Sequence, residues 1–246
     1  MTRNLINLNN NANLYYETLD KNFDQAIKLF EKNLSQYEIL ELLRNGNIAQ
    51  KQIAALKIES LQSIEDALIL TQNLVGQDGK IREAVSLKLF EFAQNPDFIE
   101  FITQPEIYDI LLNAIIDVNS NVCRNIISTI AILKSYNDFC EYFCPKLVEL
   151  TLDLVAKVKQ FDFQDGKYKV NKEVFKLYWC LETIYELSDF INLINIKKIL
   201  IQTQNIDEYT IREKTAKILS KNFVDSELIL IRNKLKTDKN YYVRRF

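Results

Sequence analysis

The sequence predicts an all-α fold of stacked helical hairpins, and three observations support this prediction. Four glycines and three prolines in 246 residues leave little material for the tight turns of a β-rich fold. Apolar residues make up 48% of the chain, which is enough to bury a large core. A helix-opening sequence at Asp78–Phe92 also returns at Asp207–Leu219 and begins again at Asp238–Arg244. Such recurrence along a helical chain is typical of stacked repeats.

Apolar periodicity and capping residues place the helices of the first half of the chain. Residues 1–13 are rich in asparagine and show no period, so we expect a disordered or frayed lead. Ser63 and Asp66 have the spacing of a capping box, while Gly46 and Gly76 are predicted to end helices, Gly46 in the left-handed conformation. The predicted helices cover residues 14–33, 36–44, 48–61, 64–75, 80–93, 96–102 and 105–117.

One interruption divides the helices of the second half. Phe161–Lys169 contains the turn signal Asp165-Gly166 and is predicted to form a loop of about nine residues or a small hairpin. Before this loop, Pro145 is expected to start or kink the long helical segment over residues 137–160. Helices are predicted over residues 121–134, 137–160, 171–187, 189–203, 208–222 and 226–237, with the first turn of one more helix in residues 240–246.

The recurring sequence carries a marker residue, basic or small, directly after the apolar residue that opens a helix. Markers fall at Arg82, Cys123, Arg212 and Arg244 and, without the apolar opener, at Lys51. The long gap after Cys123 has room for two units. With that division the spacings fit the range of about 30 to 47 residues that helical-hairpin repeats show.

On these residues the chain resembles the HEAT-repeat family. In that family a turn with Asp precedes Val/Ile-Arg and a second helix that carries small residues. The resemblance implies one domain over residues 14–246, an armadillo-type right-handed α-α superhelix of about five to six helical hairpins. The matching residues are Asp78, Ile81 and Arg82, then Asp207, Ile211 and Arg212, and finally Asp117 and Val122 with Cys123 in place of the Arg.

The resemblance also implies a structural role for the acidic and basic residues of these turns. In HEAT proteins they bond to neighbouring repeats and form a ladder along the stack. The alternative is a basic row on the concave face that grips an acidic partner. The expected ladder residues are Asp78, Arg82, Asp117, Asp207 and Arg212.

Residues for chemistry are scarce in this sequence. It contains no histidine, which excludes Ser-His-Asp and Cys-His nucleophile systems and every metal site that needs histidine. Four glycines do not build a phosphate-binding loop. The carboxylate pairs Glu65-Asp66, Asp207-Glu208 and Glu182/Glu186 are interpreted as caps or solvated faces. We therefore expect no catalytic residue, no cofactor and no bound metal.

The cysteines Cys123, Cys140, Cys144 and Cys180 lie in apolar helical segments, and we expect reduced core residues. Cys140 and Cys144 share a helix face at a spacing that lets two thiolates bind one metal. A buried structural role is nevertheless favoured for them. No stretch of about 18 apolar residues predicts a membrane span, and we expect a cytoplasmic protein.

Two other functions on the same scaffold were weighed. A helical-repeat DNA glycosylase needs a basic concave face, aromatic side chains and a catalytic Asp. This chain has a net charge of −2, and its single tryptophan, Trp179, lies in an apolar helix with no Asp within the next turn. Nucleic acid is therefore an unlikely partner. A role like that of the HEAT proteins that attach bilins has no residue in its favour.

The sequence favours a non-catalytic scaffold or adaptor that binds a protein through its concave surface. Candidate partner contacts are aromatic residues outside the regular helical pattern. The C-terminal hairpin is expected either to be capped by the tail folding back or to expose apolar residues for self-association. The candidate contacts are Phe161, Phe163, Tyr168, Tyr241, Tyr242 and Arg244, and the residues of the C-terminal hairpin are Ile229, Leu230, Leu235 and Val243.

Overall fold

The structure is a computed structural model that describes residues 27–160, 167–221 and 223–246. Within these residues the regular structure is helical throughout, as predicted. None of the described helices combines the length and the apolar character needed to cross a membrane. The predicted N-terminal lead over residues 1–13 and most of the helix predicted for residues 14–33 fall outside the described residues.

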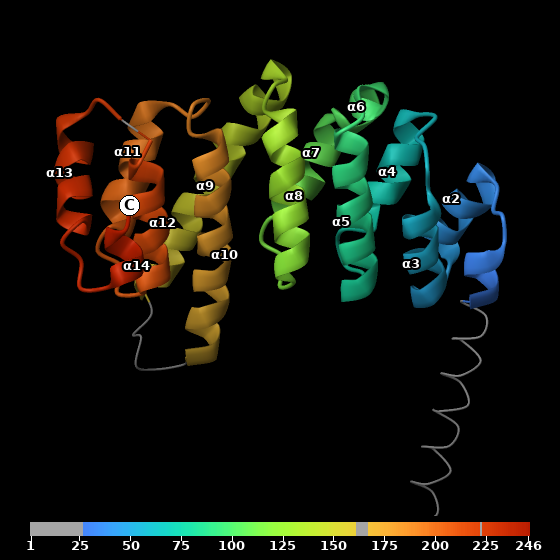
Figure 1. Ribbon diagram of the computed structural model, residues 1–246, viewed down its shortest axis with the longest axis horizontal. Helices are drawn as coiled ribbons and strands as arrows, with labels where there is room; N and C mark the ends of the chain where they lie inside the picture. Colours follow the sequence, from blue (N-terminus) through green and yellow to red (C-terminus); the bar gives the residue numbers. More distant parts are fainter. Residues whose placement is uncertain (1–26, 161–166, 222) are drawn as a thin grey trace, which may run out of the picture. The chain divides into compact units, whose positions relative to one another are not determined.

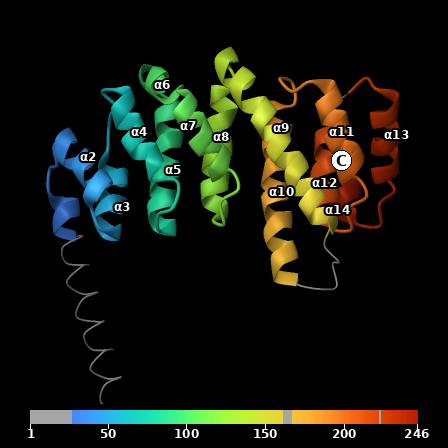
Figure 2. The same cartoon turned by 180° about the vertical axis from the view of Figure 1, so that it is seen from behind.

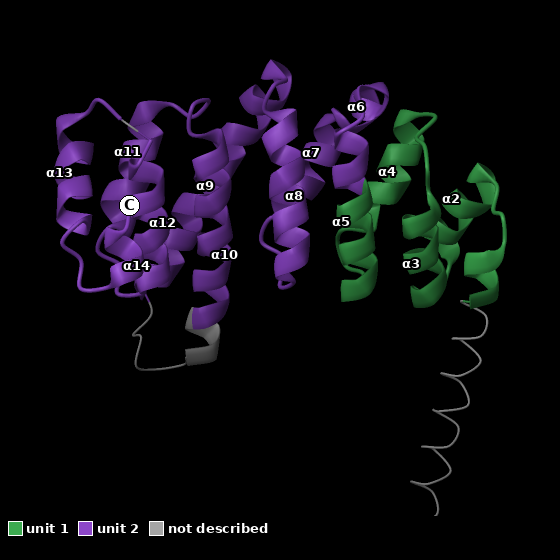
Figure 3. Ribbon diagram, in the orientation of Figure 1, with its two compact units in different colours: residues 1–88 green, residues 89–246 purple. Residues whose placement is uncertain are grey.

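The chain forms two compact units, residues 1–88 and residues 89–246 (Figure 3). Helix α5 (Gly79–Ala93) crosses the boundary between them. Unit 1 also contains α2, α3 and α4, and α2 packs on both α3 and α4. The prediction of one domain over residues 14–246 stays a prediction. The bounds in unit 1 are Gln36–Asn45 for α2, Ile48–Lys57 for α3 and Ile64–Gln72 for α4.

Two helices of unit 1, α3 and α4, end earlier than their apolar pattern predicted. α3 ends at Lys57 because Ile58 is extended and buried. α4 ends at Gln72, where the buried Asn73 side chain donates hydrogen bonds to the carbonyls of Leu43 and Ile69. Tertiary contacts of single side chains therefore override the local preference for helix.

The two turn glycines of unit 1 have different functions. The prediction of a left-handed Gly46 is wrong, because its φ is −68°. A Cβ at Gly46 would lie 2.4 Å from the carbonyl oxygen of Leu42, so this position needs glycine for a close approach of the backbone. Gly76 has a φ of 71° and does supply the left-handed conformation, four residues after the end of α4.

Unit 2 contains the remaining helices, in positions close to those predicted. Two differences matter. α11 starts after its cap Asn192 rather than at Asp189. Pro145 lies inside α9, so of the two expected alternatives it does not start this helix, and the kink stays a prediction. The bounds are Pro96–Ile102 for α6, Pro105–Ala114 for α7, Ser120–Leu133 for α8, Asn137–Gln160 for α9, Lys167–Leu187 for α10, Leu193–Thr203 for α11, Tyr209–Leu219 for α12, Ser226–Leu235 for α13 and Tyr241–Arg244 for α14.

The start of α10 corrects the loop prediction. α10 begins at Lys167, so Tyr168 lies in its first turn and not in a loop. Phe161 and Phe163, the other aromatic residues assigned to that loop, lie outside the described residues. The candidate contact surface that was to combine these three residues is therefore not formed by one loop.

The helices of unit 2 form two layers. α7, α9, α11 and α13 pack one against the next in one layer, and α8, α10, α12 and α14 do the same in the other. Pairs such as α9 with α10 and α11 with α12 join the layers. Figure 1 shows α10 in front of α9, and the view from behind in Figure 2 shows α9 in front. Each hairpin of this unit therefore gives one helix to each layer.

Aromatic side chains fill part of the core of unit 2. Phe139 and Phe143 lie one turn apart on α9 and stack with ring centroids 4.9 Å apart. Tyr108 of α7 meets Phe139 edge-on at 4.9 Å. All three are buried. Offset and edge-on contacts of this kind add to the burial energy of the rings.

Asparagine and aspartate side chains close most of the turns. In these turns a side-chain oxygen accepts a hydrogen bond from the backbone N–H two residues later, which satisfies a free donor at a helix start. Asp117 accepts from Asn119 at 2.7 Å, and Asp238 accepts from Asn240 at 2.8 Å. The same bond is made by Asp78, Asn95, Asn119, Asn192, Asp225 and Asn240.

The marker residues also stabilise the turns. Four of them donate a hydrogen bond from the side chain back to a backbone carbonyl of the preceding turn. Arg212 Nη1 donates to the carbonyls of Ile206 and Asp207, each at 2.7 Å. Cys123 Sγ donates to the carbonyl of Asp117 at 3.2 Å. The equivalent acceptors are Gln77 for Arg82, and Asp238 and Lys239 for Arg244.

Arg212 also bonds to the next turn of the chain. Its Nε lies 2.7 Å from one carboxylate oxygen of Asp238, and its Nη2 lies 3.3 Å from the other. The two side chains are 9% and 10% exposed. The hydrogen bond from Arg212 holds the pKa of Asp238 below its usual value of 3.8, although burial opposes this shift. This pair links the turn before α12 to the turn before α14.

Replacing Arg212 with Ala should lower the free energy of unfolding of unit 2 by about 3 kcal/mol, because it leaves a shielded carboxylate and two turn carbonyls without their donor. Denaturation in urea, followed by the fluorescence of Trp179, measures this loss. The matched control is Lys157→Ala, which breaks an exposed pair with Asp153 and should cost less than about 1 kcal/mol.

The same pair predicts a pH dependence with a definite sign. The folded pKa of Asp238 is depressed, so its contribution is present above pH 3.8 and is lost as the pH falls through the folded value. The difference between wild type and Arg212→Ala should therefore shrink on acidification. Equal losses in Arg212→Ala and Lys157→Ala at neutral pH would contradict the assignment.

Candidate functional site

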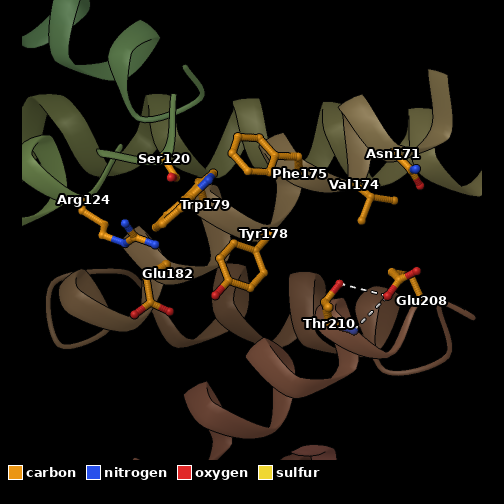
Figure 4. Close-up of a pocket in the computed structure, with 10 residues that line it drawn as sticks. All are labelled: Ser120, Arg124, Asn171, Val174, Phe175, Tyr178, Trp179, Glu182, Glu208 and Thr210. Carbon is orange, nitrogen blue, oxygen red and sulfur yellow. Dashed lines mark hydrogen bonds between the residues drawn. The ribbon is translucent and has the colours of Figure 1, made fainter. Parts of the chain in front are cut away.

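A groove of 650 Å³ lies in unit 2 among α8, α10 and α12. We call it the α10 groove, because α10 supplies most of its lining. Figure 4 shows its residues, with the aromatic rings of α10 between the side chains of α8 and α12. The lining residues are Ser120 and Arg124 of α8, Asn171, Val174, Phe175, Tyr178, Trp179 and Glu182 of α10, and Glu208 and Thr210 at the start of α12.

The aromatic wall of the groove follows from the spacing of residues on α10. Phe175, Tyr178 and Trp179 recur at intervals of three and four, which places them on one helix face. The ring of Trp179 meets Phe175 at 5.9 Å and Tyr178 at 5.1 Å, both edge-on. Trp179 is 6% exposed, while Phe175 and Tyr178 are half-buried. The three rings therefore hold one another and present a firm apolar surface.

Arg124 lies at the edge of this wall. Its guanidinium lies over the Trp179 ring, 5.9 Å from the centroid, and its Nη1 donates to Asn121 Oδ1 at 3.1 Å. The side chain is exposed. In Figure 4 it extends toward the space between Trp179 and Glu182. Stacking on an indole and one hydrogen bond restrain the guanidinium without neutralising its charge.

Glu182 is held by two lysines of α12. Lys214 Nζ lies 2.7 Å from Oε2, and Lys217 Nζ lies 2.5 Å from Oε1. Lys214 is 8% exposed and lies over the Tyr178 ring at 4.3 Å. Lys217 lies over the Tyr185 ring at 4.2 Å. The carboxylate, the two ammonium groups and the two rings form one network between α10 and α12.

The network keeps Glu182 and Lys214 charged at neutral pH. Burial alone raises the pKa of Glu182, but the hydrogen bonds from Lys214 and Lys217 outweigh it and leave the pKa below 4.5. Burial alone lowers the pKa of Lys214, but its bonds to Glu182 and Tyr178 leave that pKa above 10.5. Two ammonium groups and one carboxylate give this network a surplus of positive charge.

The indole N–H of Trp179 is a further polar group in the groove wall. Trp179 Nε1 is shielded from solvent, and no atom of the described residues accepts a hydrogen bond from it. Leaving a buried donor unpaired costs about 1 to 3 kcal/mol. The wall of the groove thus contains a donor that an acceptor from outside the described chain would satisfy.

Some groove residues were noted in the sequence but interpreted differently. Trp179 was assigned to an apolar core helix, and it does pack there, yet one side lines the groove. Glu182 and Glu186 were interpreted as caps or solvated faces, and for Glu182 this is wrong, because its side chain is 19% exposed and lies between two lysines. The two carboxylates have separate partners, because Glu182 binds Lys214 and Lys217 while Glu186 lies 3.4 Å from Lys134. The spacing of the carboxylates was therefore the available signal.

The predicted ladder residues lie in turns, outside the groove. Asp78 and Asp117 cap their turns through side-chain oxygens, and Asp207 contributes its backbone carbonyl to Arg212. Arg82 donates to the carbonyl of Gln77. In unit 2 the bond between Arg212 and Asp238 links one turn to the next, and Asp238 was not among the predicted ladder residues. Whether the ladder continues through all repeats stays a prediction.

The candidate contacts at the C-terminal end are partly exposed. Tyr241 and Tyr242 are exposed and lie 5.8 Å apart, whereas the Arg244 guanidinium is occupied by turn carbonyls. Val243 is fully buried, and α14 packs on α12, so the tail folds back as a cap. Leu235 is buried with it, while Ile229 and Leu230 remain exposed. The tail therefore caps part of the hairpin and leaves Ile229 and Leu230 exposed, while self-association stays a prediction.

The four cysteines are buried free thiols. Burial raises the pKa of Cys123, Cys144 and Cys180 to about 12 and raises that of Cys140 as well. Their thiolate fraction at neutral pH is correspondingly small. Among the described residues, no group of three or more Cys, Asp or Glu side chains is placed to hold a metal ion.

Replacing Glu182 with Gln should lower the free energy of unfolding by about 3 kcal/mol, because it leaves the buried Lys214 without a counter-charge. Denaturation followed at Trp179 measures the loss. The double variant Glu182→Gln/Lys214→Gln should recover part of it, since neither charge is then unpaired. Asp153→Asn, in an exposed pair, serves as the control and should cost less than about 1 kcal/mol. A double variant no more stable than the single one would refute this role.

Comparisons with known proteins place few constraints on function. No family model matches the chain, and no curated protein matches it. Among solved structures, the crystal structure of an engineered protein is similar, with 16% sequence identity and a TM-score of 0.46. The alignment covers 87% of this chain and 93% of that chain. The function has to be argued from the α10 groove itself.

Proposed function

We propose that this chain is a non-catalytic scaffold or adaptor that binds a protein partner through the α10 groove. The observation that carries the proposal is the placement of Arg124, a restrained and exposed cation, beside the aromatic wall of α10. Binding sites combine such an apolar surface with a few placed polar groups. Tyr, Trp and Arg are also the residues that contribute most to protein interfaces.

The two layers of unit 2 support a HEAT-like architecture for this scaffold. Layered hairpins and repeated turns with a donating marker fit a right-handed α-α superhelix, in which each repeat contacts its neighbours. In that architecture α8, α10 and α12 are successive second helices. A groove along them then lies on the surface that repeat proteins of this kind use for binding.

The two carboxylates of the groove, Glu182 and Glu208, are bonded in ways that support binding rather than acid–base catalysis. Both oxygens of Glu182 are engaged by ammonium groups, and its pKa lies below its usual value. A general acid or base at neutral pH needs a pKa near 7. Glu208 caps α12 by accepting from Thr210. The two carboxylates of the groove thus serve structural functions.

Nucleic acid is the second candidate, because aromatic rings and stacked arginines also hold unpaired bases. Such binding relies on several cations along the phosphate backbone. Lys214 and Lys217 share Glu182, so Arg124 is the groove cation that lacks a carboxylate partner among the described residues. A single cation of this kind fits a protein ligand better than a polyanion.

Site-specific photo-crosslinking in the host cell tests the proposal. A benzoylphenylalanine at Asn171, an exposed residue at the groove, should give a protein adduct, because a partner in the groove passes within reach of it. The same probe at Lys198, exposed on α11, serves as the control. Adducts should disappear when Tyr178→Ala is added. Adducts of equal strength at both positions, or nucleic acid in place of protein at Asn171, would exclude this function.

A further inference from the structure

Two polar groups of the α10 groove are donors that the described residues leave partly or wholly unpaired, the Arg124 guanidinium and the Trp179 indole N–H. Of the two carboxylates of the groove, Glu182 is paired with two lysines, and Glu208 accepts through Oε1 from Thr210. Arg124 spends one N–H on Asn121 and keeps the others, and the indole N–H of Trp179 has no acceptor among the described residues. A ligand that completes these bonds must bring acceptors.

The net charge of the groove also favours a ligand with an anionic acceptor. Arg124, Lys214 and Lys217 contribute three positive charges, while Glu182 and Glu208 contribute two negative ones. These groups sum to one positive charge, and Arg124 is the exposed cation among them. Because that guanidinium is already stacked on Trp179, binding it costs little additional side-chain ordering.

The apolar wall of the groove limits the kind of ligand that can bring this acceptor. Val174, Phe175 and Tyr178 offer aliphatic and aromatic surface next to Arg124 rather than further cations. A volume of 650 Å³ is in the range of sites that enclose a drug-sized ligand or a few side chains. The complementary ligand is therefore compact, with one anionic group beside one apolar group.

We propose that the α10 groove binds a short acidic segment of a partner protein. An Asp or Glu carboxylate of that segment pairs with Arg124, and a neighbouring aliphatic or aromatic side chain packs on Phe175 and Tyr178. Arg and carboxylate form strong charge-assisted hydrogen bonds, and burial beside the rings strengthens them. This assignment rests on the proposed function, since it names the chemistry of the partner at the same groove.

Selection from a phage-displayed library of random heptapeptides tests the assignment. The library is panned on the full chain, on Arg124→Gln and on Arg44→Gln. The control removes an exposed arginine of α2, which pairs with Glu65 and belongs to unit 1. Selected peptides without tryptophan are synthesised and titrated against the chain. Trp179, the single tryptophan, reports occupancy of the groove by its fluorescence.

Wild type and Arg44→Gln should both select peptides with Asp or Glu next to an aliphatic or aromatic residue. Arg124→Gln should bind the same peptides about tenfold or more weakly, which is the effect of losing a charged hydrogen bond. Arg124→Glu should instead select Lys or Arg at the acidic position. Thermal melts of each variant, compared with wild type, exclude a loss caused by unfolding.

The outcomes separate the ligand chemistry from the function. Peptides that perturb Trp179 but lack an acidic residue, or that bind Arg124→Gln as tightly as wild type, would overturn the acidic ligand and leave the protein-binding function standing. A selection in which no peptide perturbs Trp179 would overturn both. A fluorescence change with single-stranded DNA, lost in Arg124→Gln, would also overturn both and favour the nucleic-acid alternative.

Discussion

Hydrogen bonds from side chains to the backbone of the turns are the constraint on which this structure depends. Each helix end leaves free N–H or carbonyl groups that need partners. A left-handed glycine is the usual way to end a helix, but among the described residues only Gly76 has a positive φ. Asp and Asn side chains therefore satisfy the amides, and marker residues satisfy the carbonyls. The many asparagines of this chain thus have a physical use.

Two functions of the marker residue are separable. Cys123 donates to its own turn, as Arg212 does, but a thiol is too short to reach the next turn. Arg212 closes its own turn and also reaches the next one, because its guanidinium donates both to the carbonyl of Ile206 and to the carboxylate of Asp238. Closing a turn needs only a donor at the right position, whereas linking successive turns needs a long, bidentate group. This difference explains why Arg and Cys occupy equivalent positions without being interchangeable.

The sequence predicted most helices of the described residues, because apolar period and caps are local signals. Errors arose where the local pattern did not decide the conformation, in one case because of a distant group. Asn73 ends α4 by bonding to Leu43, thirty positions earlier in the chain. Gly46 is extended, and its backbone lies so close to the Leu42 carbonyl that a Cβ would clash there. Tyr168 was assigned to a loop because the turn signal Asp165-Gly166 precedes it, although α10 already starts at Lys167.

The groove was beyond sequence reasoning for a related reason. Arg124, Trp179 and Lys214 lie on three helices, and each alone has an ordinary structural interpretation. Glu182 and Glu186 gave the strongest hint, since like charges one turn apart require separate partners. No local pattern shows, however, that the partners of Glu182 are Lys214 and Lys217. That information depends on how α10 and α12 pack.

The chemistry of the groove depends on which charges are already paired rather than on how many are present. A buried ion pair contributes little net stability, so the Glu182 network is better explained by what it fixes than by its energy. The network holds the Tyr178 ring under Lys214. It also pairs Lys214 and Lys217 with Glu182, so these lysines are not free to bind a ligand. Arg124 differs because its neighbours are an indole face and an amide, neither of which neutralises it. The selectivity proposed for the groove follows from that difference.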